Sequence, residues 1–346
     1  MALRITQAKT PLAVLLLISP FFFWGTAMVA MKGVIPETEP FFLAGTRLLP
    51  AGILVLLAGL WMGRSQPNSW QGWAWISLFA LVDGTLFQGF LAQGLVRTGA
   101  GLGSVMIDSQ PLAVALMARW LFAEQIGPLG WIGLAFGLMG ISLLGLPDHW
   151  ITGFFQGQLS WQDLPADGLA LGRLLFDQGE WLMLLAALSM AVGTILIRYV
   201  ARHADPVMAT GWHMVIGGVP LLVLSGVYES QPWSQIDGAG WGAIAYSTIL
   251  GSALAYGVFF YLASKGNLTS LSALTFLTPV FALTFGNLFL GEVLSLLQWL
   301  GVSLTIVSIY LINQRDALTA RLKNLSQTQI EIQASTKSEP PLESDL

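Results

Sequence analysis

Three charged side chains lie inside long apolar stretches of the sequence, namely Arg47, Asp83 and Asp108. An ionised aspartate at the centre of a bilayer costs roughly 2.5 to 3.5 kcal/mol on insertion scales, so each one needs a partner, water or a bound proton. We expect at least one aspartate to bind a cationic ligand group or a coupling proton. A static ion pair with Arg47 that holds neighbouring helices together is the alternative. Arg47 itself suits a carboxylate, which a guanidinium can hold through two parallel hydrogen bonds.

Two prolines, Pro111 and Pro279, interrupt apolar segments that are long enough to be helices. A proline inside a helix removes one backbone hydrogen bond and bends the chain. At membrane depth such irregular backbone is tolerated only against protein or a water-filled cavity. The pattern therefore predicts two kinks beside a cavity, and kinks that serve packing alone are the alternative. The residues that we expect to line this cavity and bind a ligand are Trp24, Asp83, Gln88, Asp108, Gln110, Tyr256, Thr275 and Thr278.

An acidic residue follows each proline at the same distance, Glu124 in one segment and Glu292 in the other. Each lies where its apolar segment ends, so both should lie at a membrane surface. Carboxylates at such positions can act as gates that bind a partner in one conformation and release it in another. Two ordinary interfacial turn residues would give the same pattern.

The composition places most of the chain in lipid. Of 346 residues, 55% are hydrophobic and only 10% are charged, against about 25% charged in ordinary soluble domains. Backbone groups in hydrocarbon must be satisfied within a helix or a closed barrel, and these apolar runs lack the alternation of barrel strands. We therefore predict an all-α, polytopic membrane protein. Its ten expected spans are 12–31, 41–62, 74–95, 102–122, 128–146, 181–200, 208–227, 242–263, 270–290 and 295–313.

The basic residues predict how these spans are oriented. With the N-terminus inside, ten Lys and Arg residues fall on the cytoplasmic side and three, Lys32, Arg97 and Arg173, fall on the other side. This bias fits the positive-inside rule. We expect both termini to be cytoplasmic and the protein to be integral to the plasma (inner) membrane.

The chain also matches itself at an offset of 168 residues. Five spans per copy is an odd number, so the second copy must enter the membrane from the opposite side. Inverted repeats of this kind are typical of secondary transporters, whose halves exchange conformations to give alternating access. The expected parts are a first five-helix repeat (1–147), an extracytoplasmic linker (148–180), a second, inverted repeat (181–313) and a disordered cytoplasmic tail (314–346). The aligned pairs include Gly25 with Gly193, Thr26 with Thr194, Gln88 with Tyr256, Pro111 with Pro279, and Glu124 with Glu292.

Two segments carry a resemblance to a known family. Residues 104–124 and 272–292, each with its internal proline and terminal glutamate, resemble two helices of the EamA-like branch of the drug/metabolite transporter (DMT) superfamily. The run Phe23-Trp24-Gly25 and Arg47 also fit that family. The resemblance implies ten helices around a central cavity and a carrier of small organic metabolites such as amino acids, commonly an exporter. The buried aspartates would suit proton coupling in such a carrier.

Several kinds of site are missing from the sequence. It has no Gly-Lys-Ser/Thr phosphate-binding motif, no cysteine and only three scattered histidines, so we expect no ATP engine, metal, cofactor or catalytic residue. A net charge of −4 argues against nucleic acid as a partner. An intramembrane enzyme acting on a lipid or isoprenoid would need a carboxylate cluster or a nucleophile pair. A non-transporting membrane scaffold, the other alternative, would have all its charges paired.

Small residues on the span 128–146 form a face suited to close helix packing, with Gly133, Gly137 and Gly140 at intervals of three and four. Such a face packs either within the fold or between two copies of the chain. The expected partners are therefore a small organic solute, the lipid bilayer and, if the face lies outside, a second protomer in a homodimer.

Overall fold

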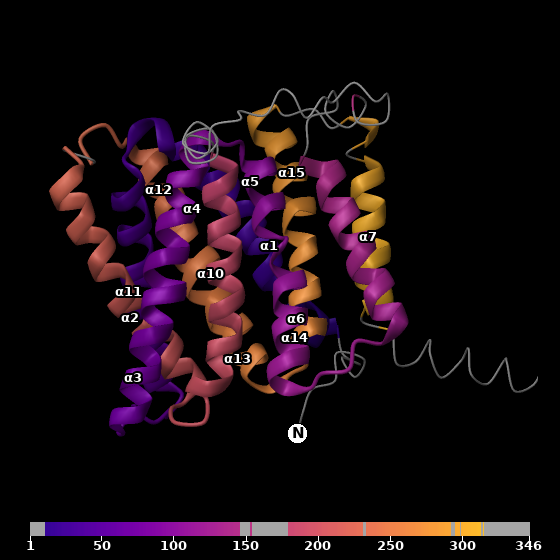
Figure 1. The fold of residues 1–346 in the computed structure, drawn as a ribbon. Helices are drawn as coiled ribbons and strands as arrows, with labels where there is room; N and C mark the ends of the chain where they lie inside the picture. The colour runs from indigo at the N-terminus through magenta and orange to yellow at the C-terminus, as the bar shows by residue number, and fades with distance from the viewer. Residues whose placement is uncertain are drawn as a thin grey trace, which may run out of the picture.

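The computed structural model describes residues 11–145, 153, 179–230, 233–291, 295–297, 299–312 and 314. Within these ranges all regular structure is helical (Figure 1). Seven segments are long and apolar enough to cross a membrane, and two shorter apolar helices, Gly127–Gly140 and Trp299–Ile312, accompany them. The predicted all-α membrane protein is therefore confirmed. The expected linker and tail fall almost entirely outside the described residues.

The helices follow the expected spans closely, with some spans built from two or three consecutive helical segments. Up to residue 145 they are α1 (Pro11–Val34), η2 (Ile35–Glu37), α2 (Pro40–Trp61), α3 (Trp70–Phe79), η3 (Ala80–Phe87), α4 (Gln88–Arg97), α5 (Ala100–Ile107), α6 (Gln110–Phe122) and α7 (Gly127–Gly145). From residue 179 they are α10 (Gly179–Val200), α11 (Pro206–Tyr228), α12 (Gly238–Thr248), η5 (Ile249–Leu254), α13 (Ala255–Lys265), α14 (Leu268–Ser272), η6 (Ala273–Phe276) and α15 (Leu277–Leu290).

The helices stand side by side, so the bundle has two ends (Figure 1). We call them the Val34 end, where α1 finishes, and the Trp61 end, where α2 finishes. Polar caps begin several helices at these ends. Asp205 accepts the backbone N–H of Val207 at 2.9 Å, and Asp237 accepts that of Gly240 at 2.7 Å. These caps satisfy backbone donors that a helix start leaves open.

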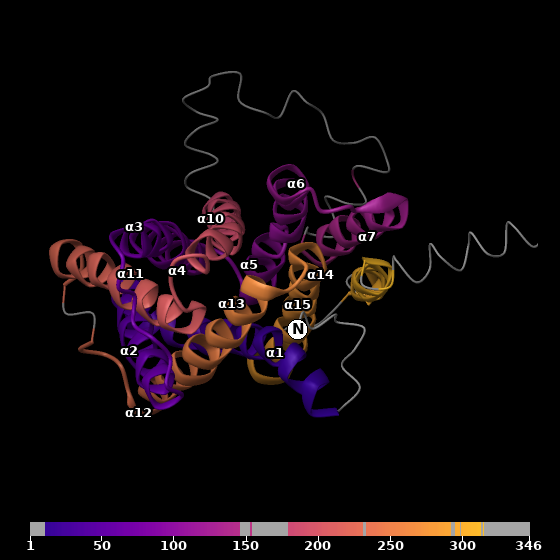
Figure 2. The ribbon, with the colours of Figure 1, turned by 90° about the horizontal axis from the view of Figure 1, so that it is seen from below.

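Two helices, α1 and α10, lie between the α2, α3 and α11 side of the bundle and the α6, α7 and α15 side (Figure 2). α1 packs against α12, α13 and α15, while α10 packs against α3, α4, α5 and α6. A long contact between α2 and α11 closes one side. The side chains between α1, α10 and their neighbours are therefore shielded from lipid and form the protein interior.

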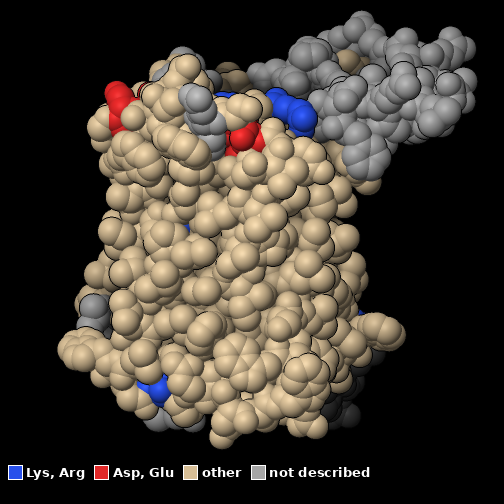
Figure 3. All heavy atoms as spheres, turned by 90° about the vertical axis from the view of Figure 1, so that its left-hand side faces the viewer, with Lys and Arg blue, Asp and Glu red and all other residues tan. Residues whose placement is uncertain are grey.

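The outer surface has the polarity that a membrane requires. In the face that Figure 3 shows, charged side chains gather near the two ends, and a broad band between them is almost free of charge. Large apolar side chains such as Leu57 and Trp120 point outward, with 57% and 83% of their surfaces exposed. Lipid tails would cover such residues at no cost in free energy.

Two stretches of π-helix interrupt long spans at positions about 168 residues apart. η3 separates α3 from α4, and η5 separates α12 from α13. Adding 168 to the bounds of η3 gives 248–255, a range that contains η5. π-Helical turns are rare and frequently occur at functional sites. Asp83 lies inside η3.

The spans that contain Pro111 and Pro279 both lose α-helical geometry shortly before the proline. α5 ends at Ile107 and α6 begins at Gln110, with Pro111 in its first turn. The other span passes through the 3-10 segment η6 before Pro279. Both prolines are buried, so the irregular backbone lies against protein and not against lipid.

The small-residue face of α7 is covered within the chain. A Cβ added to Gly133 would lie 2.6 Å from Ile312, and one added to Gly140 would lie 2.6 Å from the Thr305 hydroxyl. Both neighbours belong to the short helix Trp299–Ile312. The glycines thus allow two helices of one chain to approach closely. This face was the sequence feature that suggested a homodimer, and the structure covers it within the chain.

Candidate functional site

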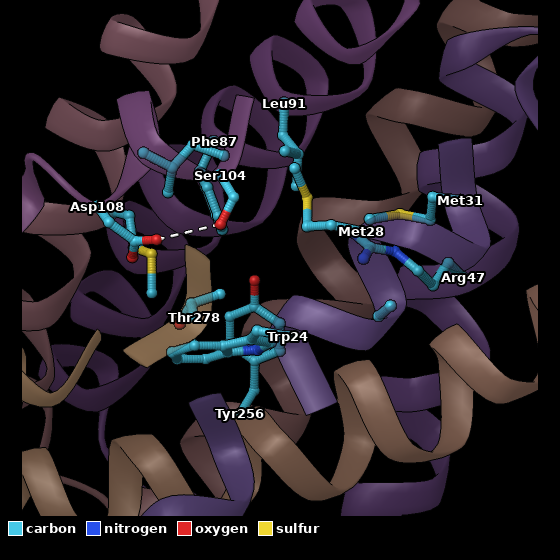
Figure 4. A pocket seen from close by; sticks show the side chains of 13 residues that line it. Trp24, Met28, Met31, Arg47, Phe87, Leu91, Ser104, Asp108, Tyr256 and Thr278 are labelled. Atoms are coloured by element: carbon cyan, nitrogen blue, oxygen red, sulfur yellow. Dashed lines mark hydrogen bonds between the residues drawn. The ribbon is translucent and has the colours of Figure 1, made fainter. Parts of the chain in front are cut away.

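A small cavity lies near the centre of the bundle (Figure 4). Its volume is about 40 Å³, room for a few water molecules, whereas pockets that hold organic ligands span roughly 300 to 1,000 Å³. An organic solute therefore enters only when the surrounding helices separate. The polar and aromatic side chains that line the cavity are Trp24, Arg47, Phe87, Ser104, Asp108, Tyr256 and Thr278.

Asp108 lies on one side of the cavity, at the break between α5 and α6. Its carboxylate accepts a hydrogen bond from the Ser104 hydroxyl at 3.2 Å, and Thr275 from η6 lies beside it. Only 3% of Asp108 is exposed. Among the described residues no basic side chain forms an ion pair with it. A carboxyl group with hydroxyl neighbours and no cation is a good site for an ammonium group or a proton.

Arg47 lies across the cavity from Asp108 (Figure 4). Its guanidinium donates to the Gln88 side-chain oxygen, and the Gln88 amide donates to the Tyr256 hydroxyl at 2.9 Å. Gln88 and Tyr256 are completely or almost completely buried. No described carboxylate pairs with Arg47, so the alternative of an ion pair between Arg47 and an aspartate is absent here, and Arg47 bonds to a neutral side chain instead. The positive charge therefore remains available to an anionic group in the cavity.

Several polar atoms around the cavity have no hydrogen-bond partner among the residues that the structure describes. They are the Arg47 Nε, the Trp24 Nε1 and the Thr278 Oγ1 atoms, all on buried side chains. A buried polar group without a hydrogen bond costs about 1 to 3 kcal/mol. Water or a solute in the cavity would supply the missing partners. Trp24 also packs against Tyr256, with ring centroids 5.1 Å apart.

Asp83 does not line this cavity. Its Oδ2 atom lies 3.2 Å from Nε2 of His213 on α11, and both side chains are buried. The other His213 nitrogen, Nδ1, lies 2.5 Å from the Thr210 carbonyl oxygen. Phe79 stacks on the imidazole with a centroid distance of 4.0 Å. The structure thus places the first predicted aspartate in a separate buried site, in contact with a histidine.

Gln110, at the start of α6, contacts α10. Its side-chain amide donates to the Thr194 hydroxyl of α10 at 3.0 Å, while its own oxygen has no hydrogen-bond partner among the described residues. Gln110 therefore ties α6 to α10. Of the residues predicted to bind a ligand, Asp83, Gln88, Gln110 and Thr275 are not among those that line the cavity.

Glu124 joins three segments at the Trp61 end. Its carboxylate accepts the backbone N–H groups of Leu268 at 3.1 Å and Thr269 at 3.3 Å, which begin α14. It also pairs with Arg198 of α10 at 3.3 Å, and Arg198 donates to the Gly266 carbonyl. We call this arrangement of Glu124 and Arg198 the Glu124 latch. Glu292, its expected counterpart, lies outside the described residues.

A basic residue makes the corresponding contact at the Val34 end. The Lys32 ammonium donates to the carbonyl oxygens of Leu95 at 2.9 Å and Thr98 at 2.7 Å. Adding 168 to these two numbers gives Ala263 and Gly266, the two carbonyl groups that accept from Arg198. Each end of the bundle therefore has a cation bound to equivalent carbonyl groups at the end of a helix.

A second cavity, of about 520 Å³, lies between α1, α12 and α15. Its lining is mostly apolar, and the Thr26 and Tyr246 hydroxyl groups bond to each other within it at 2.6 Å. Glu37 is the single charged residue among its lining side chains. This cavity lacks the two opposite charges, Arg47 and Asp108, that line the central cavity.

The apolar helical fold, together with the family match and the named relatives below, identifies the class of protein: an integral membrane transporter of small solutes. The chain belongs to the EamA-like transporter family, whose model matches residues 11–146 and 177–314. The predicted resemblance is therefore confirmed.

Named relatives agree with this assignment. The chain is 65% identical over 312 residues to the uncharacterized transporter sll0355 of Synechocystis sp., covering 90% of this chain and 92% of that protein. It is 52% identical over 301 residues to the WAT1-related protein At3g02690, chloroplastic, of Arabidopsis thaliana, covering 86% and 68% respectively. A solved crystal structure of a protein superposes with a TM-score of 0.67 at 19% identity, over 89% of this chain and 97% of that one, and supports the fold alone.

Proposed function

We propose that this protein is a secondary transporter that exports small zwitterionic metabolites, such as amino acids, by alternating access. One observation carries the proposal: Arg47 and Asp108 face the same buried cavity, and neither has an ionic partner among the described residues. Opposite charges held apart in this way match a solute that carries a carboxylate and an ammonium group.

The chemistry of the lining supports this solute class. An arginine binds a carboxylate through two parallel hydrogen bonds, and such charge-assisted bonds are roughly twice as strong as neutral ones. Asp108 offers its carboxyl group to the ammonium end. The faces of Trp24 and Tyr256 would cover the organic part and add an attraction for the cation. The cavity excludes bulk water, so these interactions are less screened than at a surface.

Two features argue for alternating access. The cavity is too small for an organic solute in this conformation, so a binding cycle needs the helices to move. The matches at an offset of 168 residues, the paired π-helical segments and the two family-model matches support two related five-helix halves. We propose that these halves, 1–147 and 181–313, are inverted relative to each other and together form ten spans.

The basic residues support an orientation with the Trp61 end and both termini in the cytoplasm. In that orientation the Glu124 latch closes the cytoplasmic side, and the contacts of Lys32 hold the outer side. We further propose the plasma membrane as the location. The proposed linker, 148–180, then lies outside the cell.

The two alternatives, an intramembrane enzyme and a non-transporting scaffold, account for fewer of these observations. An intramembrane enzyme needs a nucleophile or a carboxylate cluster, and the carboxyl groups of Asp83 and Asp108 contact a histidine and hydroxyl groups in separate sites. A scaffold would pair its buried charges, yet no described carboxylate pairs with Arg47.

Flux measurements test the proposal. Purified protein in proteoliposomes should exchange radiolabelled amino acids across the membrane at rates well above protein-free vesicles. A panel of the twenty common amino acids, neutral sugars and simple amines shows which class of solute the protein exchanges. Exchange confined to sugars, or no exchange of any member of the panel, contradicts the proposed function.

Opening of the Glu124 latch should expose the central cavity to the Trp61 end. Because the chain has no cysteine, a single Thr278→Cys substitution reports on access without background labelling. Removing the ion pair with Glu124→Gln costs about 1 to 2 kcal/mol through the lost charge pair and cap, which shifts the open population roughly tenfold. We expect a membrane-impermeant maleimide to label the Thr278→Cys protein correspondingly faster from that end when Glu124→Gln is also present.

The matched control for this experiment is Arg64→Gln. Arg64 pairs with Asp205 at 3.4 Å at the same end of the bundle, and its guanidinium also contacts the ring of Tyr261 in α13. Its loss should leave the labelling rate unchanged. Equal labelling rates in the Glu124→Gln and Arg64→Gln proteins would show that the Glu124 latch does not close the cavity.

A further inference from the structure

Asp83 and His213 form a pair that is not part of the lining of the central cavity. Both side chains are almost completely buried, at 0% and 1% exposure. Asp83 lies in the π-helical segment η3, and His213 lies in the middle of α11. No other ion pair between described side chains is buried to this degree. Burying such a pair inside a membrane segment costs free energy, so ionisable residues at these positions usually have a function.

The hydrogen bonds of His213 fix how many protons the pair holds. A carbonyl oxygen only accepts, so the bond between Nδ1 and the Thr210 carbonyl requires the proton to be on Nδ1. Nε2 then faces the Asp83 carboxyl oxygen at 3.2 Å. A neutral Nε2 and an ionised carboxylate are both acceptors and would repel. One proton must therefore lie between them, on the oxygen or on the nitrogen.

The pair is electrically neutral as a unit when this proton is present. If the proton leaves, one uncompensated negative charge remains at membrane depth, which is strongly unfavourable. The proton can thus be released only when the site gains water or a substitute cation. In the described conformation the site is closed and holds its proton.

The surroundings contain few groups that could replace the proton. From α10, Gly193 lies directly against the Asp83 carboxylate. From α13, Tyr256 is the titratable group that interacts with Asp83, and Arg47 of α2 lies beyond it through Gln88. His213 is the facing group from α11. The contact with α10 is therefore the part of the wall that lacks a side chain.

The free carboxylate oxygen points to this same wall. Asp83 Oδ1 has no hydrogen-bond partner in the described part of the chain, and Gly193 without a Cβ is what lets α10 approach it. If α10 moves away from η3 during transport, water reaches Oδ1 and the proton can exchange. α10 also carries Thr194, the partner of Gln110, and Arg198 of the Glu124 latch. One helix therefore contacts the proton site, the break between α5 and α6, and the latch.

We propose that Asp83 and His213 bind one transported proton, which is exchanged when α10 separates from η3 and which couples solute export to the proton gradient. The inference rests on the proposed transport function. The proton enters the shared position between Oδ2 and Nε2 from one side of the membrane and leaves to the other, with no other bond changed. His213 is a positioning residue for this proton, because it holds Asp83 through Nε2 while Thr210 fixes its ring.

Proton binding is measured first, without any solute. The chain has three histidines, so ¹⁵N-histidine NMR of the purified protein in lipid nanodiscs gives three sets of signals, and His213→Gln assigns one of them. We expect a pH series to change the His213 signals of the wild type in one step, as the shared proton is lost. In Asp83→Asn the amide donates to Nε2, and this step disappears. A wild-type His213 whose signals do not respond to pH overturns the proposal.

Coupled flux is measured second, with the amino acid that the exchange panel identifies. At zero membrane potential and one proton per solute, a pH gradient of one unit should sustain roughly tenfold accumulation in wild-type vesicles. Asp83→Asn and His213→Gln should equilibrate the solute without accumulation but retain exchange at zero gradient. His203→Gln, at an exposed position directly after α10, should behave as the wild type.

The outcomes separate the two proposals. If wild type accumulates solute with the gradient and both variants still do so, the proton site is wrong and the transport function stands. Wild-type flux that ignores the pH gradient also overturns the proton site. If wild type moves no solute, the transport function fails, and the NMR titration still decides whether the pair binds a proton.

Discussion

Replacing Arg47 with glutamine should lower the apparent affinity for a zwitterionic solute by about 10- to 150-fold. The estimate follows from the loss of a charged hydrogen-bonding group, which contributes about 1.5 to 3 kcal/mol. Arg47 is 3% exposed and its guanidinium faces the central cavity. Initial rates of amino acid exchange over a concentration series measure the effect.

The conservative variant Arg47→Lys separates binding from folding. Lysine keeps the charge but loses the planar fork that holds a carboxylate through two bonds. We expect intermediate affinity and the same maximal exchange rate as in the wild type. Wild-type affinity in Arg47→Gln protein of normal thermal stability would exclude Arg47 from solute binding.

Adding one methyl group at Gly193 should abolish transport and destabilise the protein. A Cβ at this position would lie 2.7 Å from the Asp83 Cβ and 2.8 Å from its Cγ atom. Overpacking of this kind costs about 1 to 3 kcal/mol, and it separates α10 from η3. We expect Gly193→Ala to lower the thermal unfolding midpoint in detergent and to reduce amino acid exchange to the level of empty vesicles.

Gly226→Ala provides the matched control. Gly226 is also a helical glycine, in α11, but a Cβ there meets nothing within 4 Å. Because alanine favours a helix over glycine by about 1 kcal/mol, this variant should be as stable as the wild type or slightly more stable, with full exchange. Equal behaviour of the two variants would mean that the contact between α10 and Asp83 is not close in the functional protein.

The spans of this fold were predictable because the bilayer leaves the backbone few choices. Apolar runs such as 41–62 and 181–200 correspond closely to α2 and α10. The irregular backbone near Pro111 was also predictable, because the ring removes a donor and the hydrocarbon cannot replace it. The π-helical segments carry no comparable signal, since nothing in the residues of η3 excludes an ordinary helix.

The partners of the charged side chains were harder to predict. The sequence suggested Arg47 as the partner of an aspartate, whereas the structure pairs Asp83 with His213 and gives Arg47 a glutamine. Which charges meet depends on how the helices are rotated, and apolar periodicity determines rotation poorly when both faces of a helix are apolar. His213 was nevertheless a signal, because it is the single ionisable side chain in the span 208–227 and needed a partner.

The second charge of the cavity, Asp108, allows the central claim to be tested directly. The measurement is exchange of leucine, leucinamide, which lacks the carboxylate, and 4-methylpentanoate, which lacks the amine, by wild type, Arg47→Gln and Asp108→Asn proteins. The account predicts that wild type prefers leucine, that Arg47→Gln loses this preference over leucinamide, and that Asp108→Asn loses it over 4-methylpentanoate. The same order of preference in all three proteins would contradict the claim that Arg47 and Asp108 hold the two ends of one solute.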